Sequence, residues 1–105
     1  MDTGAVVERV REYADLLLRQ QVLVSKVVLY GSHVRGTARE DSDIDVAVVV
    51  PTIDEDWLDF SARLFRLTRD VDLRISPVAL EEGNDASGFL EHVLQTGEIV
   101  YSRDT

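Results

Sequence analysis

The sequence predicts an α/β (α+β) protein in which a small mixed β-sheet is flanked by helices. Three observations support this fold class. Two short segments rich in β-branched residues end at glycine or proline, as buried strands do. Longer segments before and after them repeat apolar residues at the spacing of amphipathic helices. At 105 residues the chain is long enough for one core, so we expect a single domain over residues 1–105.

The first half of the chain predicts one helix and two strands. A helix is expected over residues 6–20, where the apolar positions follow helical spacing: Val6, Val10, Tyr13 and Leu17. Residues 26–30 (KVVLY) are short and β-branched and stop at Gly31, so they predict a buried strand. Residues 44–50 predict a second strand, which Pro51 ends.

The second half predicts two further helices and two further strands. A helix over residues 54–69 carries four apolar side chains on one face, which we expect in the core: Trp57, Phe60, Leu64 and Leu67. The alternating residues 71–75 stop before Pro77 and predict a third strand. A final helix is expected over residues 89–96, and residues 99–101 predict a short edge strand.

The connections between the strands predict how they pair. Ten residues separate Ser32 from Asp43. A parallel crossover needs a dozen or more, so the first two strands are predicted to be antiparallel neighbours. A full helix joins the second strand to the third, which favours a parallel pair. We therefore expect Ser32 to lie beside Asp43 and Asp45, and Asp72, near the start of the third predicted strand, to lie next to that pair.

Composition limits the classes of function. The formal charge is −9, from 20 acidic and 11 basic residues, which argues against direct nucleic-acid binding because that usually depends on clustered Lys and Arg. The chain has no cysteine, so disulfides and thiolate metal sites are excluded. No apolar run approaches the roughly 20 residues of a membrane span, and no basic region leads into an apolar one at the N-terminus. We expect a cytoplasmic protein without membrane association.

The acidic residues around the second predicted strand indicate a metal site. Side chains in a strand alternate between faces, so Asp43 and Asp45 point the same way. Two carboxylates roughly 7 Å apart on one face repel each other unless a cation lies between them. Mg²⁺ prefers such oxygen ligands together with substrate phosphates. With Asp72 as a third acid, the set suits two-metal phosphoryl transfer, and we predict that all three residues are catalytic and bind metal.

The turn after the first predicted strand suits phosphate binding. Gly31 removes the Cβ where a phosphate must approach the backbone, and Ser32 begins a turn that we expect to be weakly helical, with a hydroxyl and free N–H donors. Arg35 and Arg39 are close enough in sequence to assist, in a supporting role. Gly31, Ser32 and Arg35 are therefore predicted to bind the nucleotide.

Several residues near these motifs leave alternatives open. Asp70 lies two residues before Asp72 on the same nominal face and is a second candidate for the third acid. Arg74 shares the face of Asp72 and could form an ion pair with it, which would lower metal affinity or orient the acid. His33 is more consistent with a solvated or hydrogen-bonded histidine than with a catalytic one. His92 is given no role.

The motifs together resemble a known family. The resemblance is carried by the Gly-Ser pair, the spacer and the Asp-x-Asp pair, and by flanking positions: Gly31, Ser32, Arg35, Gly36, Ser42, Asp43, Asp45 and Asp72. This pattern resembles the minimal nucleotidyltransferases of the polymerase-beta-like superfamily, and a chain this short is similar to the antitoxin of HEPN/MNT toxin–antitoxin pairs. The resemblance implies the nucleotidyltransferase fold, two Mg²⁺ ions, ATP as the substrate, and transfer of AMP to a tyrosine of a partner HEPN ribonuclease.

Two other functions fit the same residues. The chain could be an antitoxin that neutralises its partner by stoichiometric binding, with the acidic residues kept but unused. It could also be a small-molecule nucleotidyltransferase, like those that modify aminoglycosides, assembled as a homodimer. Its short length leaves no second domain for an acceptor, so we expect the acceptor site to be completed by a partner.

Overall fold

The computed structural model describes residues 3–103, which form a four-stranded sheet in the order β3-β2-β1-β4. The strands are β1 (Lys26–Tyr30), β2 (Ile44–Val50), β3 (Ile75–Glu81) and β4 (Glu98–Ser102). The helices are α1 (Thr3–Arg19), α2 (Ser32–Arg35), α3 (Trp57–Leu67) with the 3₁₀ turn η1 (Thr68–Asp70), and α4 (Phe89–Thr96). The predicted fold class is therefore confirmed: helices and a mixed sheet form one α/β arrangement.

The strand pairing follows the predicted directions. β1 pairs with β2 antiparallel, with Tyr30 opposite Asp45, and β2 pairs with β3 parallel, with Asp45 beside Ser76. β4 is an edge strand that runs antiparallel to β1. As expected, the short connection between β1 and β2 gives an antiparallel pair, and the helical connection between β2 and β3 gives a parallel pair.

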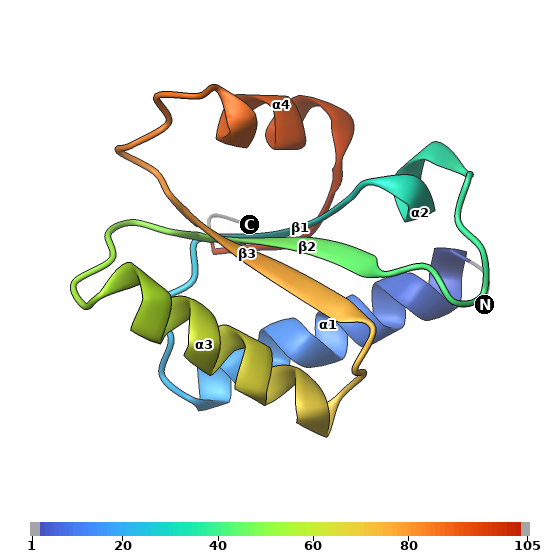
Figure 1. Cartoon of the computed structure of the whole chain (residues 1–105), viewed down its shortest axis with the longest axis horizontal. Helices are drawn as coiled ribbons and strands as arrows, with labels where there is room; N and C mark the ends of the chain where they lie inside the picture. Colours follow the sequence, from blue (N-terminus) through green and yellow to red (C-terminus); the bar gives the residue numbers. More distant parts are fainter. Residues whose placement is uncertain (1–2, 104–105) are drawn as a thin grey trace.

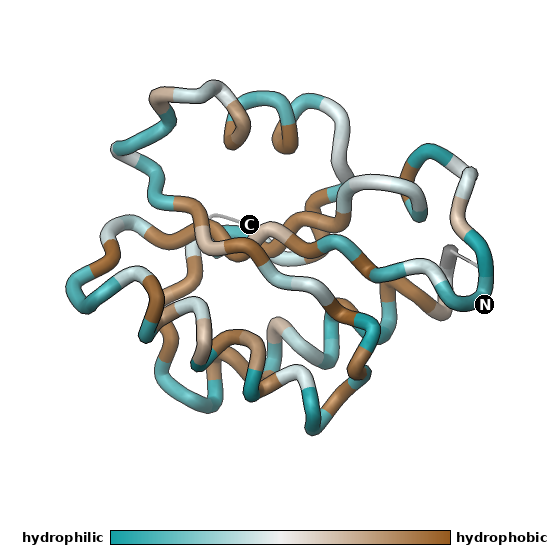
Figure 2. Tube along the Cα trace, viewed as in Figure 1, coloured by the Kyte–Doolittle hydropathy of each residue, from teal (hydrophilic) through white to brown (hydrophobic). Residues whose placement is uncertain are grey.

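The helices cover the two faces of the sheet unequally. In Figure 1, α1 and α3 lie together on one face and α4 lies on the other. The larger core cluster is formed by α1, α3 and the strand residues that face them, and a smaller cluster lies under α4 around Val28, Ala47 and Val93. Figure 2 shows the hydrophobic stretches concentrated in the strands, with polar and apolar residues alternating along α1 and α3. The Tyr13 hydroxyl donates to the Leu64 carbonyl at 2.8 Å and ties α1 to α3.

The third strand lies later in the chain than the sequence predicted. We expected it over residues 71–75, ended by Pro77, but β3 begins at Ile75 and includes Pro77. A proline is tolerated there because β3 is an edge strand, where a missing N–H can face away from the sheet. Asp72 consequently lies in the turn before β3 and outside the strand.

The second long helix also differs at its start. The Asp56 side chain accepts hydrogen bonds from the backbone N–H groups of Leu58 and Asp59 at 2.9 and 3.2 Å, so it caps a helix that begins at Trp57, later than the predicted residue 54. Phe60 and Leu64 are buried as expected, whereas Trp57 is 50% exposed and not part of the core. The predicted first and last residues of β1, β2 and α4 are confirmed.

No helix within residues 3–103 has the length and apolar character needed to cross a membrane.

Candidate functional site

Gly31 and Asp45 lie in direct contact, at the end of β1 and the start of β2. Gly31 has φ +81° and ψ −147°, a backbone conformation that is essentially restricted to glycine. A Cβ built on Gly31 would overlap Oδ2 of Asp45 and lie 3.2 Å from its Cγ. Both the positive φ and the overlap with Asp45 therefore exclude a side chain at residue 31. Because Gly31 has no side chain, the Asp45 carboxylate packs directly against its backbone.

The carboxylate of Asp45 lies in an unfavourable environment for its charge. Burial raises the pKa of the Asp45 carboxyl above its usual range, and the negative charge of Asp43 raises it further. Electrostatic interaction with His33 and Arg35 lowers the pKa of Asp45 in part. Asp43 is exposed and immediately precedes β2. A bound divalent cation would relieve this repulsion, which makes the two acids suitable as cation ligands.

The predicted phosphate turn forms a short helix. Ser32 is the first residue of α2, and the Gly31 carbonyl accepts hydrogen bonds from the N–H groups of Val34 and Arg35, both at 3.1 Å. Gly36, in the left-handed conformation, ends the helix. The helix is short because glycines flank its four residues on both sides. Arg35 is thereby brought close enough to Asp45 to affect the pKa of that acid.

Arg39, which was expected to assist phosphate binding, forms a hydrogen bond within the turn that leads into Asp43. The backbone N–H of Arg39 donates to Oγ of Ser42 at 2.8 Å, and the Arg39 side chain is exposed. Arg39 therefore contributes to the shape of the loop before β2.

The Asp72 carboxylate is paired with arginine side chains. The Asp72 carboxylate accepts from the Arg74 guanidinium at 2.7 Å (Nη2) and 3.0 Å (Nε), and from the Arg74 backbone N–H at 2.9 Å. Nε of Arg9, in α1, lies 3.8 Å from the same carboxylate. Within residues 3–103, no group of three or more His, Asp or Glu side chains is placed to hold one metal ion. β3 starts at Ile75 and presents Ser76 beside Asp45. The role of Asp72 as a third acid for this site stays a prediction.

One of the open alternatives is answered by these contacts. The ion pair between Asp72 and Arg74 exists, and its hydrogen bonds hold the pKa of the Asp72 carboxyl below its usual range. Asp70 is exposed in the 3₁₀ turn η1. His33 is only 8% exposed, and its buried Nε2 has no hydrogen-bond partner within residues 3–103.

A cavity of about 440 Å³ adjoins Gly31 and Asp45. Its lining comes from the end of β1, from α2, from β2 and from α4: Tyr30, Gly31, Val34, Arg35, Asp45, Phe89, His92 and Thr96. The rings of Tyr30 and Phe89 meet edge to face, with centroids 5.6 Å apart and planes at 82°. The three residues from α4 were not predicted from the sequence, although their i, i+3, i+7 spacing places them on one helix face.

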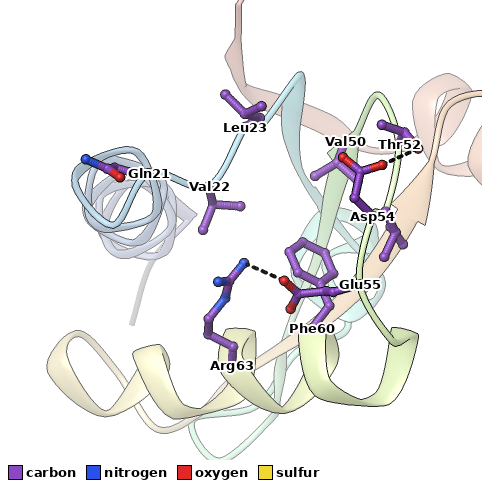
Figure 3. A pocket seen from close by; sticks show the side chains of 10 residues that line it. Gln21, Val22, Leu23, Val50, Thr52, Asp54, Glu55, Phe60 and Arg63 are labelled. Carbon is purple, nitrogen blue, oxygen red and sulfur yellow. Dashed lines mark hydrogen bonds and ion pairs between the residues drawn. The ribbon is translucent and has the colours of Figure 1, made fainter.

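A second, smaller hollow lies at the other end of β2. It measures about 140 Å³, and Figure 3 shows its lining side chains, with the Arg63 guanidinium directed toward Glu55. Those two groups are 3.7 Å apart, and Arg63 also lies 5.5 Å above the Phe60 ring. Because Val50 marks this end of β2 and Asp45 the other, the hollow is separate from the acidic pair.

The fold and the acidic site together define a class of protein. A mixed sheet in which a Gly-Ser turn meets an Asp-x-Asp strand has the arrangement of a nucleotidyltransferase domain. Residues 14–105 match the family model described as Polymerase beta, Nucleotidyltransferase, and the chain belongs to this family.

Solved structures have the same fold. A candidate nucleotidyltransferase from Sulfolobus solfataricus is 20% identical, with a TM-score of 0.72 over 98% of this chain and 86% of that one. A candidate minimal nucleotidyltransferase is 30% identical, with a TM-score of 0.62 over 92% of this chain and 94% of that one. A toxin–antitoxin structure with AMP-PNP is 19% identical, with a TM-score of 0.64 over 88% and 73%. No curated protein matches the sequence.

Proposed function

We propose that the protein is a Mg²⁺-dependent nucleotidyltransferase that transfers AMP from ATP to a hydroxyl group of a partner protein. The observation that carries the proposal is the contact between Gly31 and Asp45. It places a carboxylate suited to a cation against the backbone of the Gly-Ser turn, within the motif that resembles the family. Membership of the nucleotidyltransferase family supports the reaction class.

The donor set fits a divalent cation. Asp43 and Asp45 offer carboxylate oxygens from the start of one strand, and Mg²⁺ is typically held by one or two carboxylates with substrate phosphates completing its shell. When bound, the ion would neutralise charge on the triphosphate and on the departing pyrophosphate. A second ion would need a further donor. Asp72 would supply it only after leaving Arg74, and the exposed Asp70 is the alternative.

The residues of the chain itself would bind and orient the substrate. Gly31 and Ser32 provide open backbone and a hydroxyl to the phosphates, and Arg35 adds a positive charge beside Asp45. In the transfer, the acceptor oxygen forms a bond to the α-phosphorus, the bond from that phosphorus to the bridging oxygen breaks, and pyrophosphate leaves. The acceptor hydroxyl proton passes to a carboxylate. Asp72, once free of Arg74, is our candidate for positioning or deprotonating that hydroxyl.

The acceptor is proposed to be a toxin that pairs with this chain as its antitoxin. A structural neighbour is a toxin–antitoxin complex with AMP-PNP, and the sequence motifs resemble those of antitoxins that modify a tyrosine of a HEPN ribonuclease. The formal charge of −9 would attract a basic ribonuclease and steer its approach.

One observation favours a second function, an antitoxin that acts by binding alone. The third acid expected for catalysis, Asp72, is engaged in ion pairs with Arg74 and Arg9. A pure binder would tolerate this pairing, because it needs the surface of the domain and not its chemistry.

The two functions are separated by labelling. The protein and its co-purified partner would be incubated with Mg²⁺ and labelled ATP, and each polypeptide would be analysed by intact mass. We expect AMP-sized mass increases on the partner with wild type, and with Asp41→Asn as the matched control, since Asp41 is an exposed acid two residues before the pair. The increases should disappear when Asp43 and Asp45 are both replaced by Asn.

Equal labelling by the double variant and wild type would rule out the enzymatic proposal. Neutralisation of the toxin without labelling by any variant would instead establish the binding function.

A further inference from the structure

We propose that the cavity beneath α4 binds the base of the nucleotide, with Phe89 and Tyr30 forming its aromatic wall. This inference rests on the proposed nucleotidyltransferase function and adds a subsite to it, built from a helix outside the Gly-Ser and Asp-x-Asp motifs. The ligand class is the nucleoside part of a triphosphate: a flat aromatic heterocycle attached to ribose.

The cavity lies directly beside the turn proposed to bind phosphate. Tyr30, Gly31 and Ser32 are consecutive residues, so the aromatic wall of the cavity continues into that turn. Asp45 belongs to the cavity and to the cation site alike. A triphosphate held at Gly31 and Ser32 therefore has the cavity as its immediate neighbour, and the volume of about 440 Å³ lies within the range of small-molecule sites.

The walls of the cavity have the chemistry that a base requires. Phe89 and Tyr30 are in edge-to-face contact at 5.6 Å, which fixes both rings relative to the sheet. Val34 adds an aliphatic side chain, and both rings pack against the small core cluster under α4. A rigid, partly aromatic wall beside charged groups suits stacking of a base, because every base has a π face.

One edge of the cavity is polar. His92 and Thr96 are one helical turn apart on α4 and both line the cavity. The Thr96 hydroxyl donates to the His92 carbonyl at 2.8 Å, so its oxygen has only acceptor capacity left. The imidazole of neutral His92 offers one donor and one acceptor. The cavity thus combines apolar walls with a few hydrogen-bonding groups, as sites for heterocycles do.

The test compares two ligands that share the phosphates and differ in the nucleoside. Binding of ATP and of inorganic tripolyphosphate would be measured by calorimetry in Mg²⁺, with wild type, Phe89→Leu and Phe65→Ala. Leucine keeps apolar volume at residue 89 and loses the ring. Phe65 is a 49% exposed phenylalanine on α3 and serves as the control. Thermal unfolding would verify that each variant is folded.

We expect Phe89→Leu to weaken ATP binding roughly tenfold, as loss of one stacking contact does, and to leave tripolyphosphate binding unchanged. Phe65→Ala should change neither. In addition, amide NMR signals of α4 should shift with ATP and not with tripolyphosphate.

Two results would overturn the inference. Equal affinity for the two ligands in wild type, with no signal change in α4, would show that the cavity does not hold the base, and would leave the proposed function intact. Failure of both ligands to bind in Mg²⁺ would remove the proposed function and the base site together.

Discussion

At the scale of single residues, two separate features require glycine at residue 31: its backbone conformation and the space available for a side chain. Its backbone conformation favours glycine, and the volume that a side chain would fill belongs to the Asp45 carboxylate. Gly36 also has a positive φ, +78°, but no residue beyond its chain neighbours lies within 4 Å of the place that a Cβ would occupy there. Substitution of Gly36 would therefore report backbone strain alone, whereas substitution of Gly31 would report backbone strain together with displacement of Asp45.

We predict that Gly31→Ala abolishes nucleotide binding whereas Gly36→Ala mainly lowers stability. Alanine at either site adopts a disfavoured positive φ, which costs about 1–2 kcal/mol. Only at residue 31 does the new methyl group push against Asp45. Calorimetric titration with ATP and Mg²⁺, alongside urea unfolding, measures both effects. Normal ATP affinity in folded Gly31→Ala would contradict the role of this contact.

The sequence predicted the central residues of the site and missed its far wall. Alternation along a strand places Asp43 and Asp45 on one side, and a glycine before a short helix is a local pattern, so both were accessible from spacing alone. Phe89 and His92 reach the site because α4 packs over the sheet more than 40 residues after β2 begins. No local sequence pattern predicts this tertiary contact, although the helical spacing of Phe89 and His92 indicates that they share one face of α4.

At the scale of elements, a charged turn immediately precedes β3. Three hydrogen bonds from Arg74 hold the Asp72 side chain, which is 12% exposed, just before the strand begins. The sequence predicted the parallel direction of β3 and left the ion pair between Asp72 and Arg74 open. The position of the strand does not follow from the sequence, because a proline is typical of a strand end and is also tolerated within an edge strand such as β3.

We predict that Asp72→Asn destabilises the protein at neutral pH by about 1–3 kcal/mol, the usual cost of leaving a partner of a part-buried polar network unsatisfied. Asp70→Asn, at an exposed acid two residues earlier, is the control and should be nearly neutral. Urea unfolding of both variants measures the difference. Labelling assays on the same variants would show which acid, if either, serves transfer.

The effect of Asp72 should depend on pH in one direction. The pKa of Asp72 is lowered in the folded state by its hydrogen bonds to Arg74. Its stabilising contribution is therefore fully present above the ordinary aspartate pKa of about 3.9 and is lost as the pH falls through the lower folded value. The stability difference between wild type and Asp72→Asn should shrink over that acidic range. A difference that grows with acidification would contradict the pairing.

The start of α3 offers a second prediction for an element. Asp56→Ala removes an acceptor for two backbone N–H groups and should cost about 1 kcal/mol of stability. Asp54→Ala, at an exposed acid outside the helix, should change stability less. Urea unfolding of the two variants compares them directly. Equal effects would mean that the charge matters and the cap does not.

At the scale of the whole molecule, the net charge of −9 predicts that the protein does not bind nucleic acid. We expect no binding of a labelled single-stranded RNA at physiological ionic strength of about 0.15 M, because an acidic chain lacks the excess of Lys and Arg that releases counterions from a polyanion. Fluorescence anisotropy, with a basic RNA-binding protein as the positive control, measures this. Saturable binding that weakens with added salt would oppose the expectation.

The position of Pro77 also affects how copies of the molecule can meet. An edge strand presents unpaired backbone groups on which another chain can build, and proline interrupts that row of donors. β3 carries this interruption near its middle, whereas β4, the opposite edge, contains no proline. Strand-to-strand association between molecules at high concentration is thus directed away from the side of the sheet that carries Asp72 and Arg74, and toward the edge formed by β4.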